Sequence, residues 1–238
     1  MKKIILALIL CLGALPAQAA DFSNWAVMII AGDDHSHSGA PSQVFDNARR
    51  DLARAFTTIG FNPNNIVEFS PDPDKEAQQL EPTVLATSLW DLSNRAPAGC
   101  LIYYTSHGTP QGIIMDNGQM TPDNWGHIVN NACGSKPAMI VMSACYSGQF
   151  VPVLGGAHRL VMTAARPDRT SFGCGDDDHY TFFDGCFLQT LPGVGNFTDL
   201  ALRTKECVGR LEAQFGVDYP SEPMIALGKE VGDSLKWR

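Results

Sequence analysis

From Trp25 to its end, the chain alternates between short apolar, β-rich runs and segments with helical periodicity, and few folds accommodate this order. Six strands are predicted, at Ala26–Ala31, Ile66–Phe69, Cys100–Thr105, Ala138–Ala144, Leu160–Ala164 and Met224–Leu227. Most of these runs are continuously apolar, which suits strands that are buried on both faces. Strands that alternate with helices are typical of a doubly wound, mostly parallel sheet. We therefore predict an α/β domain built on a six-stranded sheet.

The intervening segments carry helix and turn signals. An apolar stripe over Val44–Ile59 lies on one helical face and stops before Gly60, a suitable C′ residue. Thr121 and Pro122 form an N-cap and N1 pair ahead of a second helical stripe. The segment Asp116–Gly118 predicts a small hairpin, because Asn-Gly tolerates positive φ at both turn positions.

The N-terminus has the three parts of a secretory signal. Lys2 and Lys3 precede the apolar run Ile4–Leu15, and Ala17–Ala19 forms a small-x-small cleavage site. The run is short for a bilayer span, so an uncleaved anchor is the less favoured alternative. We expect residues 1–19 to be a signal peptide and residues 20–238 a single exported domain, periplasmic or secreted, with no membrane span.

The net charge of the chain restricts the classes of partner that it can bind. The chain has 17 Lys and Arg against 25 Asp and Glu, and two of the lysines lie in the leader, so the mature net charge is about −10. An acidic surface argues against a nucleic-acid partner. No motif predicts a cofactor.

Six cysteines remain after cleavage, in a compartment where disulfides can form. If Cys145 stays a free thiol, the other five are an odd number and at least one more is free. Cys100 with Cys133 and Cys174 with Cys186 are possible pairs. Spacing leaves the connectivity open, and each cysteine is equally suited to be a small buried apolar residue.

Polar segments follow four of the predicted strands: Asp33–His37, Ser106–Gly108, Cys145–Gly148 and Arg166–Asp178. In an open parallel sheet, ligands bind outside the carboxyl ends of the strands. We expect these four loops to converge on one edge of the sheet.

The predicted edge brings together a thiol and an imidazole. A cysteine becomes a nucleophile at neutral pH when an imidazole or a helix N-terminus lowers its pKa, and Cys145 could have both. His107 closes the neighbouring strand, and the backbone N–H groups of Gly108 and Cys145 could form an oxyanion hole. Each residue alone would more often be structural, but their joint arrangement favours a catalytic dyad.

The residues around this dyad resemble a known family. Tyr103–Gly108 and Met142–Gly148 are similar to the paired His-Gly and Ala-Cys motifs of the legumain-like (C13) peptidases, relatives of the caspases, and Thr163–Pro167 and Ser171–Cys174 extend the similarity. The resemblance implies a caspase-like three-layer sandwich and hydrolysis of peptide or protein substrates through an acyl-enzyme. By position it implies that His107 and Cys145 are the dyad.

Two departures bear on substrate choice. Legumains hold an asparagine side chain with an arginine after the first strand and a glutamate before the Ala-Cys pair, whereas Gly32–Ala48 contains no Arg and Ser143 replaces the glutamate. We assign Ser143 and Asp177 to substrate binding. An unbalanced carboxylate at Asp177 predicts a preference for a basic residue before the scissile bond; a solvated acidic loop is the alternative.

Other interpretations stay open. Asp33, Asp34, His35 and His37 are metal ligands by residue type, but their spacing matches no defined metal motif, and we expect a polar cleft loop without metal. A catalytically silent binding protein on this fold is a second possibility. A transpeptidase or ligase would use the same dyad, with an amine in place of water. The oligomeric state is left open.

Overall fold

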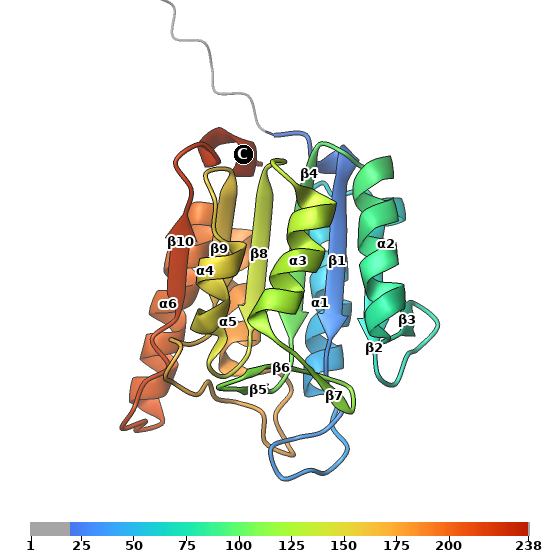
Figure 1. Cartoon of the computed structure of the whole chain (residues 1–238). Coiled ribbons are helices and arrows are strands. Elements are labelled where there is room, and N and C mark those ends of the chain that lie inside the picture. The colour runs from blue at the N-terminus through green and yellow to red at the C-terminus, as the bar shows by residue number, and fades with distance from the viewer. Residues whose placement is uncertain (1–19, 238) are drawn as a thin grey trace, which may run out of the picture.

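The computed structural model describes residues 20–237, and in it the six predicted runs form strands of one sheet (Figure 1). The strand order is β10-β9-β8-β4-β1-β2-β3, and every neighbouring pair is parallel except β9 with β10. The bounds are β1 (Trp25–Ala31), β2 (Ile66–Ser70), β3 (Ala77–Gln79), β4 (Gly99–Thr105), β8 (Ala138–Ser143), β9 (Arg159–Thr163) and β10 (Met224–Leu227). The mostly parallel sheet is confirmed. The seventh strand, β3, was not predicted because its three residues lack an apolar run.

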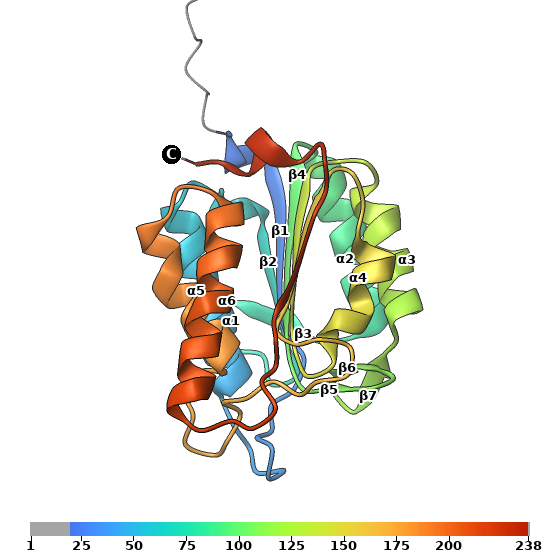
Figure 2. The same ribbon diagram turned by 90° about the vertical axis from the view of Figure 1, so that its left-hand side faces the viewer.

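Helices cover both faces of the sheet and make three layers (Figure 2). One face carries α1 (Val44–Thr58), α5 (Phe182–Thr190) and α6 (Phe197–Gln214); the other carries α2 (Pro82–Arg95), α3 (Pro122–Cys133) and α4 (Val151–Leu154). Short 3₁₀ helices complete the chain at Phe22–Asn24, Pro63–Asn65, Ser147–Phe150, Leu191–Gly193 and Gly232–Leu235. The two predicted helices are present, and Thr121 caps α3 by accepting a hydrogen bond from the Asn124 N–H.

The continuous apolar runs are explained by two separate cores. Leu101 and Tyr103 of β4 point into the core under α1, α5 and α6. Ile102 and Tyr104 of the same strand point into the core under α2 and α3. Because successive side chains alternate between faces, a strand buried on both sides needs apolar residues at every position.

A small antiparallel sheet lies beyond the carboxyl end of β4, formed by β5 (Gly108–Thr109), β6 (Gly112–Met115) and β7 (Gly118–Met120). The predicted hairpin is therefore present, but its turn differs. Met115 pairs with Gly118, so the turn residues are Asp116 and Asn117, and Asp116 has the positive φ of 53°. The expectation of positive φ at the Asn-Gly pair was wrong, because Gly118 belongs to the strand ladder.

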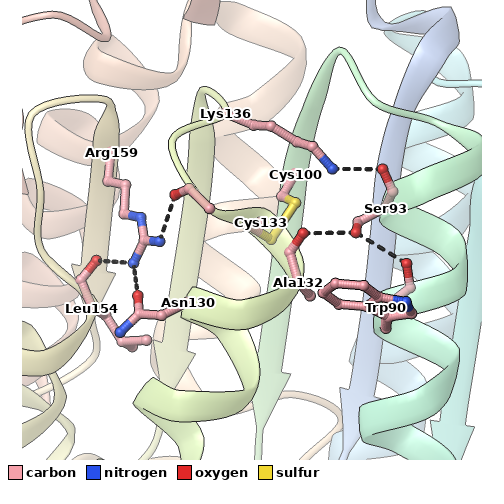
Figure 3. Close-up of a disulfide and its surroundings, with 10 residues drawn as sticks. Trp90, Ser93, Cys100, Asn130, Ala132, Cys133, Lys136, Leu154 and Arg159 are labelled. Carbon is pink, nitrogen blue, oxygen red and sulfur yellow. Dashed lines mark hydrogen bonds between the residues drawn. A yellow bond between two sulfur atoms is a disulfide. The ribbon is translucent and has the colours of Figure 1, made fainter.

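Two disulfides link strand to helix and helix to helix. Cys100 at the start of β4 is bonded to Cys133 at the end of α3, as Figure 3 shows, and Cys186 of α5 is bonded to Cys207 of α6. The possible pair Cys174–Cys186 was wrong, because α5 packs along α6 and places Cys186 with its Cα 5.7 Å from that of Cys207. Cys174 and Cys145 are free.

Within residues 20–237, no helix combines the length and apolar character needed to cross a membrane. The expected signal peptide, residues 1–19, lies outside the described residues.

Candidate active site

The four polar loops meet at the carboxyl edge of the sheet, at the bottom of Figure 1. There they enclose a cavity of about 550 Å³. The loop after β1 contributes His37, the end of β4 contributes His107 and Gly108, and the end of β8 contributes Cys145 and Tyr146. The loop after β9 contributes residues 170–175 and Asp178. The structure thus brings both members of the predicted dyad to one cavity.

Cys145 is held where the chain leaves β8. The next residue, Tyr146, has a left-handed conformation with φ of 57°, and the 3₁₀ helix Ser147–Phe150 begins directly after it. This sharp change of direction leaves Cys145 half-buried at the cavity wall. Its Sγ accepts a hydrogen bond of 3.2 Å from the Ser171 N–H. The same sulfur lies 3.6 Å from the Ser171 carbonyl oxygen, so the loop after β9 fixes the position of the thiol through one backbone residue.

His107 is oriented by two neighbours from other loops. Its Nε2 lies 3.1 Å from the His35 carbonyl oxygen, and its ring meets the Phe45 ring edge-on with centroids 5.1 Å apart. A carbonyl can only accept, so Nε2 carries the proton in this contact. In the neutral imidazole, Nδ1 is then the basic atom.

Gly108 allows two backbone segments to approach closely. A Cβ built on Gly108 would lie 2.1 Å from the carbonyl oxygen of Cys145, so any side chain would push the two loops apart. Gly108 is paired with Ile113 in the antiparallel sheet, and the hydrogen bond between the strands joins the neighbouring residues, from the Ile114 N–H to the His107 carbonyl. Gly108 and Ile113 therefore form a non-hydrogen-bonded pair, in which the Gly108 amide points away from the partner strand.

The two residues assigned to substrate binding lie elsewhere. Ser143 is buried at the end of β8, and its hydroxyl bonds to the carboxyl of Asp184 in the core rather than lining the Cys145 cavity. Asp177 lines a separate hollow with Gln43 and His179. Asp178 is the carboxylate that reaches the cavity, because the loop turns there and the Gly175 N–H donates to its Oδ2 at 2.7 Å.

Cys174, the second free thiol, also lines this cavity. Burial raises its pKa to about 11, and the nearby Cys145 and Asp178 charges add to the rise. At neutral pH it stays protonated and is therefore a poor nucleophile.

The acidic loop after β1 forms contacts of its own. The Nδ1 atom of His35 lies 3.1 Å from Asp33 Oδ1 and 2.8 Å from Asp34 Oδ1. The hydrogen bond with Asp33 and the charge of Asp34 raise the pKa of His35. These three residues could hold a cation by geometry, since their ligand atoms lie within 4.8 Å of one another. They also pair with each other, as a solvated cleft loop does.

Sequence reasoning missed the contacts that orient the dyad. The donor to Cys145 is the backbone N–H of Ser171, and the acceptor from His107 is the backbone carbonyl of His35. Every non-proline residue carries both groups, so neither contact has a residue-type signal.

Comparisons with known proteins agree with this geometry. The model of the Peptidase C13 family matches residues 83–192, a segment that contains His107 and Cys145. Among solved structures, caspase-1 from Spodoptera frugiperda is similar, with a TM-score of 0.64 and 14% sequence identity over 89% of each chain. No curated protein matches the sequence significantly. The resemblance to the C13 family and the caspase-like fold are confirmed.

Proposed function

We propose that this chain is a cysteine peptidase of the C13 type. It hydrolyses peptide bonds through an acyl-enzyme on Cys145, with His107 as general base. One observation carries the proposal. Both side chains line the same cavity, where the Ser171 N–H bonds to the sulfur and the His35 carbonyl orients the imidazole.

The chemistry follows from these atoms. Nδ1 of His107 takes the thiol proton as Cys145 Sγ attacks the substrate carbonyl carbon. The N–H groups of Gly108 and Cys145 stabilise the oxyanion. The C–N bond then breaks, and the imidazolium returns its proton to the leaving amine. Water, deprotonated by His107, attacks the thioester and releases the acid and the free thiol.

We further propose that the chain is exported, with cleavage after Ala19 and residues 20–238 as the peptidase domain. Two disulfides support this, because such bonds persist mainly in oxidising compartments. Four of the six described cysteines are paired in this way, and Cys145 and Cys174 are free.

The dyad is tested with Cys145→Ala and His107→Ala. Each change removes a reacting group, so kcat/KM on a fluorogenic peptide should fall by about 10³-fold or more, and the double variant should be little worse than either single variant. Circular dichroism would verify folding.

Cys174→Ser is the matched control, because it removes the other free thiol of the same cavity. It should retain peptide hydrolysis and labelling by a thiol-directed peptide probe, whereas Cys145→Ala should lose both. Turnover in folded Cys145→Ala would contradict the dyad. A product carrying an added amine nucleophile, with little hydrolysis, would identify a transpeptidase.

A further inference from the structure

Asp184 is a carboxylate in the core directly behind the proposed dyad. It belongs to α5 and has no solvent exposure. The Tyr103 hydroxyl donates to its Oδ1 at 2.7 Å, and the Thr105 hydroxyl donates to its Oδ2 at 2.6 Å. The Ser143 hydroxyl bonds to the same carboxyl. Three hydroxyls from two strands therefore converge on one side chain.

This arrangement costs stability. Burial raises the pKa of Asp184, against the hydrogen bonds from Thr105, Tyr103 and Ser143, which lower it. An apolar side chain packed among apolar partners would avoid the desolvation of a carboxyl group. Asp184 needs an explanation other than core packing.

Its position supplies one. Thr105 and Ser143 are the last residues of β4 and β8 and pair with each other in the sheet register. His107 and Cys145 each follow two residues later. The strand pairing ends at this pair, and one chain continues into β5 and the other into the left-handed turn at Tyr146. The carboxyl group thus bridges the last paired residues of β4 and β8.

We propose that Asp184 is a positioning residue for the dyad: by holding the Thr105 and Ser143 hydroxyls, it fixes the separation of the strand ends that carry His107 and Cys145. The inference rests on the proposed function. Enzyme rates are sensitive to this separation, since a displacement of about 1 Å can cost about 10²-fold. Ser143 then acts through the core rather than on the substrate.

The test compares variants that break the bridge with one that keeps it. Asp184→Asn and Thr105→Val should lower kcat about 10- to 100-fold while KM stays within about twofold, because substrate contacts are preserved. Thr105→Ser keeps the hydroxyl and should restore kcat to within about threefold of the wild type. The alkylation rate of Cys145, followed from pH 5 to 9, should show a higher thiol pKa in Asp184→Asn and Thr105→Val.

Ser93→Ala is the control for lost stability. Ser93 is also fully buried, and its hydroxyl donates to the Ala132 carbonyl at 2.7 Å, but it lies beside the Cys100–Cys133 disulfide, near the other end of β4 (Figure 3). It should lower the melting temperature and leave kcat and the alkylation profile unchanged.

The proposal is overturned if folded Asp184→Asn and Thr105→Val keep the kcat and alkylation profile of Ser93→Ala. It is also overturned if Thr105→Ser is as impaired as Thr105→Val. If Asp184→Asn does not fold, the kcat and alkylation profile of Thr105→Val and Ser143→Ala, which each remove one hydroxyl from the bridge, decide the proposal. Failure of the dyad itself would appear separately, as hydrolysis by Cys145→Ala.

Discussion

Among the described residues that line the Cys145 cavity, Asp178 is the one with a carboxylate. The predicted preference for a basic residue before the scissile bond therefore depends on Asp178 rather than on Asp177. Its charge is felt inside the cavity, since it contributes to the raised pKa of Cys174. Asp178 is exposed, however, and exposed ion pairs are worth only about 0.2–1 kcal/mol. The preference should therefore be modest.

We expect kcat/KM to be about two- to fivefold higher for Arg than for Asn before the scissile bond. Asp178→Asn should abolish this ratio, and Asp177→Asn, the matched control, should leave it unchanged. Matched fluorogenic peptides measure both. An Arg preference that survives Asp178→Asn, or a wild-type preference for Asn, would remove the assignment.

At the scale of elements, α1 is tied to the sheet by a buried guanidinium. Arg49 is fully buried and pairs with Asp46, Glu68 and Asp74, the last two from β2 and the loop after it. Partial burial would raise the pKa of Asp74, but its hydrogen bond and charge interaction with Arg49 outweigh this and lower the pKa to about 2. Asp74 therefore stabilises the fold only in its ionised form.

Asp74→Asn tests this contribution. A depressed carboxyl pKa adds stability above the unfolded value, near 4, and this stability is lost as pH falls towards 2. The variant should be less stable by about 1–2 kcal/mol at pH 7, and the difference should shrink at pH 2.5. Urea unfolding at both pH values measures it. An equal difference at both would show that Asp74 acts through packing instead of charge.

At the scale of the whole molecule, the Cys100–Cys133 disulfide and the proposed site lie apart. Cys100 begins β4, whereas His107 follows the end of that strand, so the Cys100–Cys133 bond secures the edge of the sheet opposite the cavity. The bond closes a segment with a sequence separation of 33 residues. Loops of this size contribute about 2–4 kcal/mol by restricting the unfolded chain.

The double variant Cys100→Ala, Cys133→Ala should lose about 2–4 kcal/mol of unfolding free energy. Its kcat/KM at 25 °C should match the wild type, because the carboxyl edge of the sheet is unchanged. Urea denaturation and peptide hydrolysis provide the two readouts. A fall in kcat for the folded double variant would mean that the disulfide also maintains the geometry of the cavity.

The sequence by itself determined the class of fold and the residues of the proposed dyad. Continuous apolar runs identify strands that are buried on both faces, and His107 and Cys145, which closely follow two of these runs, need no long-range information to be recognised. The C13 resemblance is likewise carried by short contiguous motifs.

Only the tertiary structure decided which distant groups meet these residues. Asp184 lies 79 positions from Thr105, and Ser171 lies 26 positions from Cys145. Such contacts depend on how α5 and the loop after β9 pack against the sheet, and this packing cannot be predicted from the local pattern of apolar residues. The bond of Cys186 to Cys207 likewise follows from the packing of α5 on α6. The conformation of the loop also decides that Asp178, and not its neighbour Asp177, lines the Cys145 cavity.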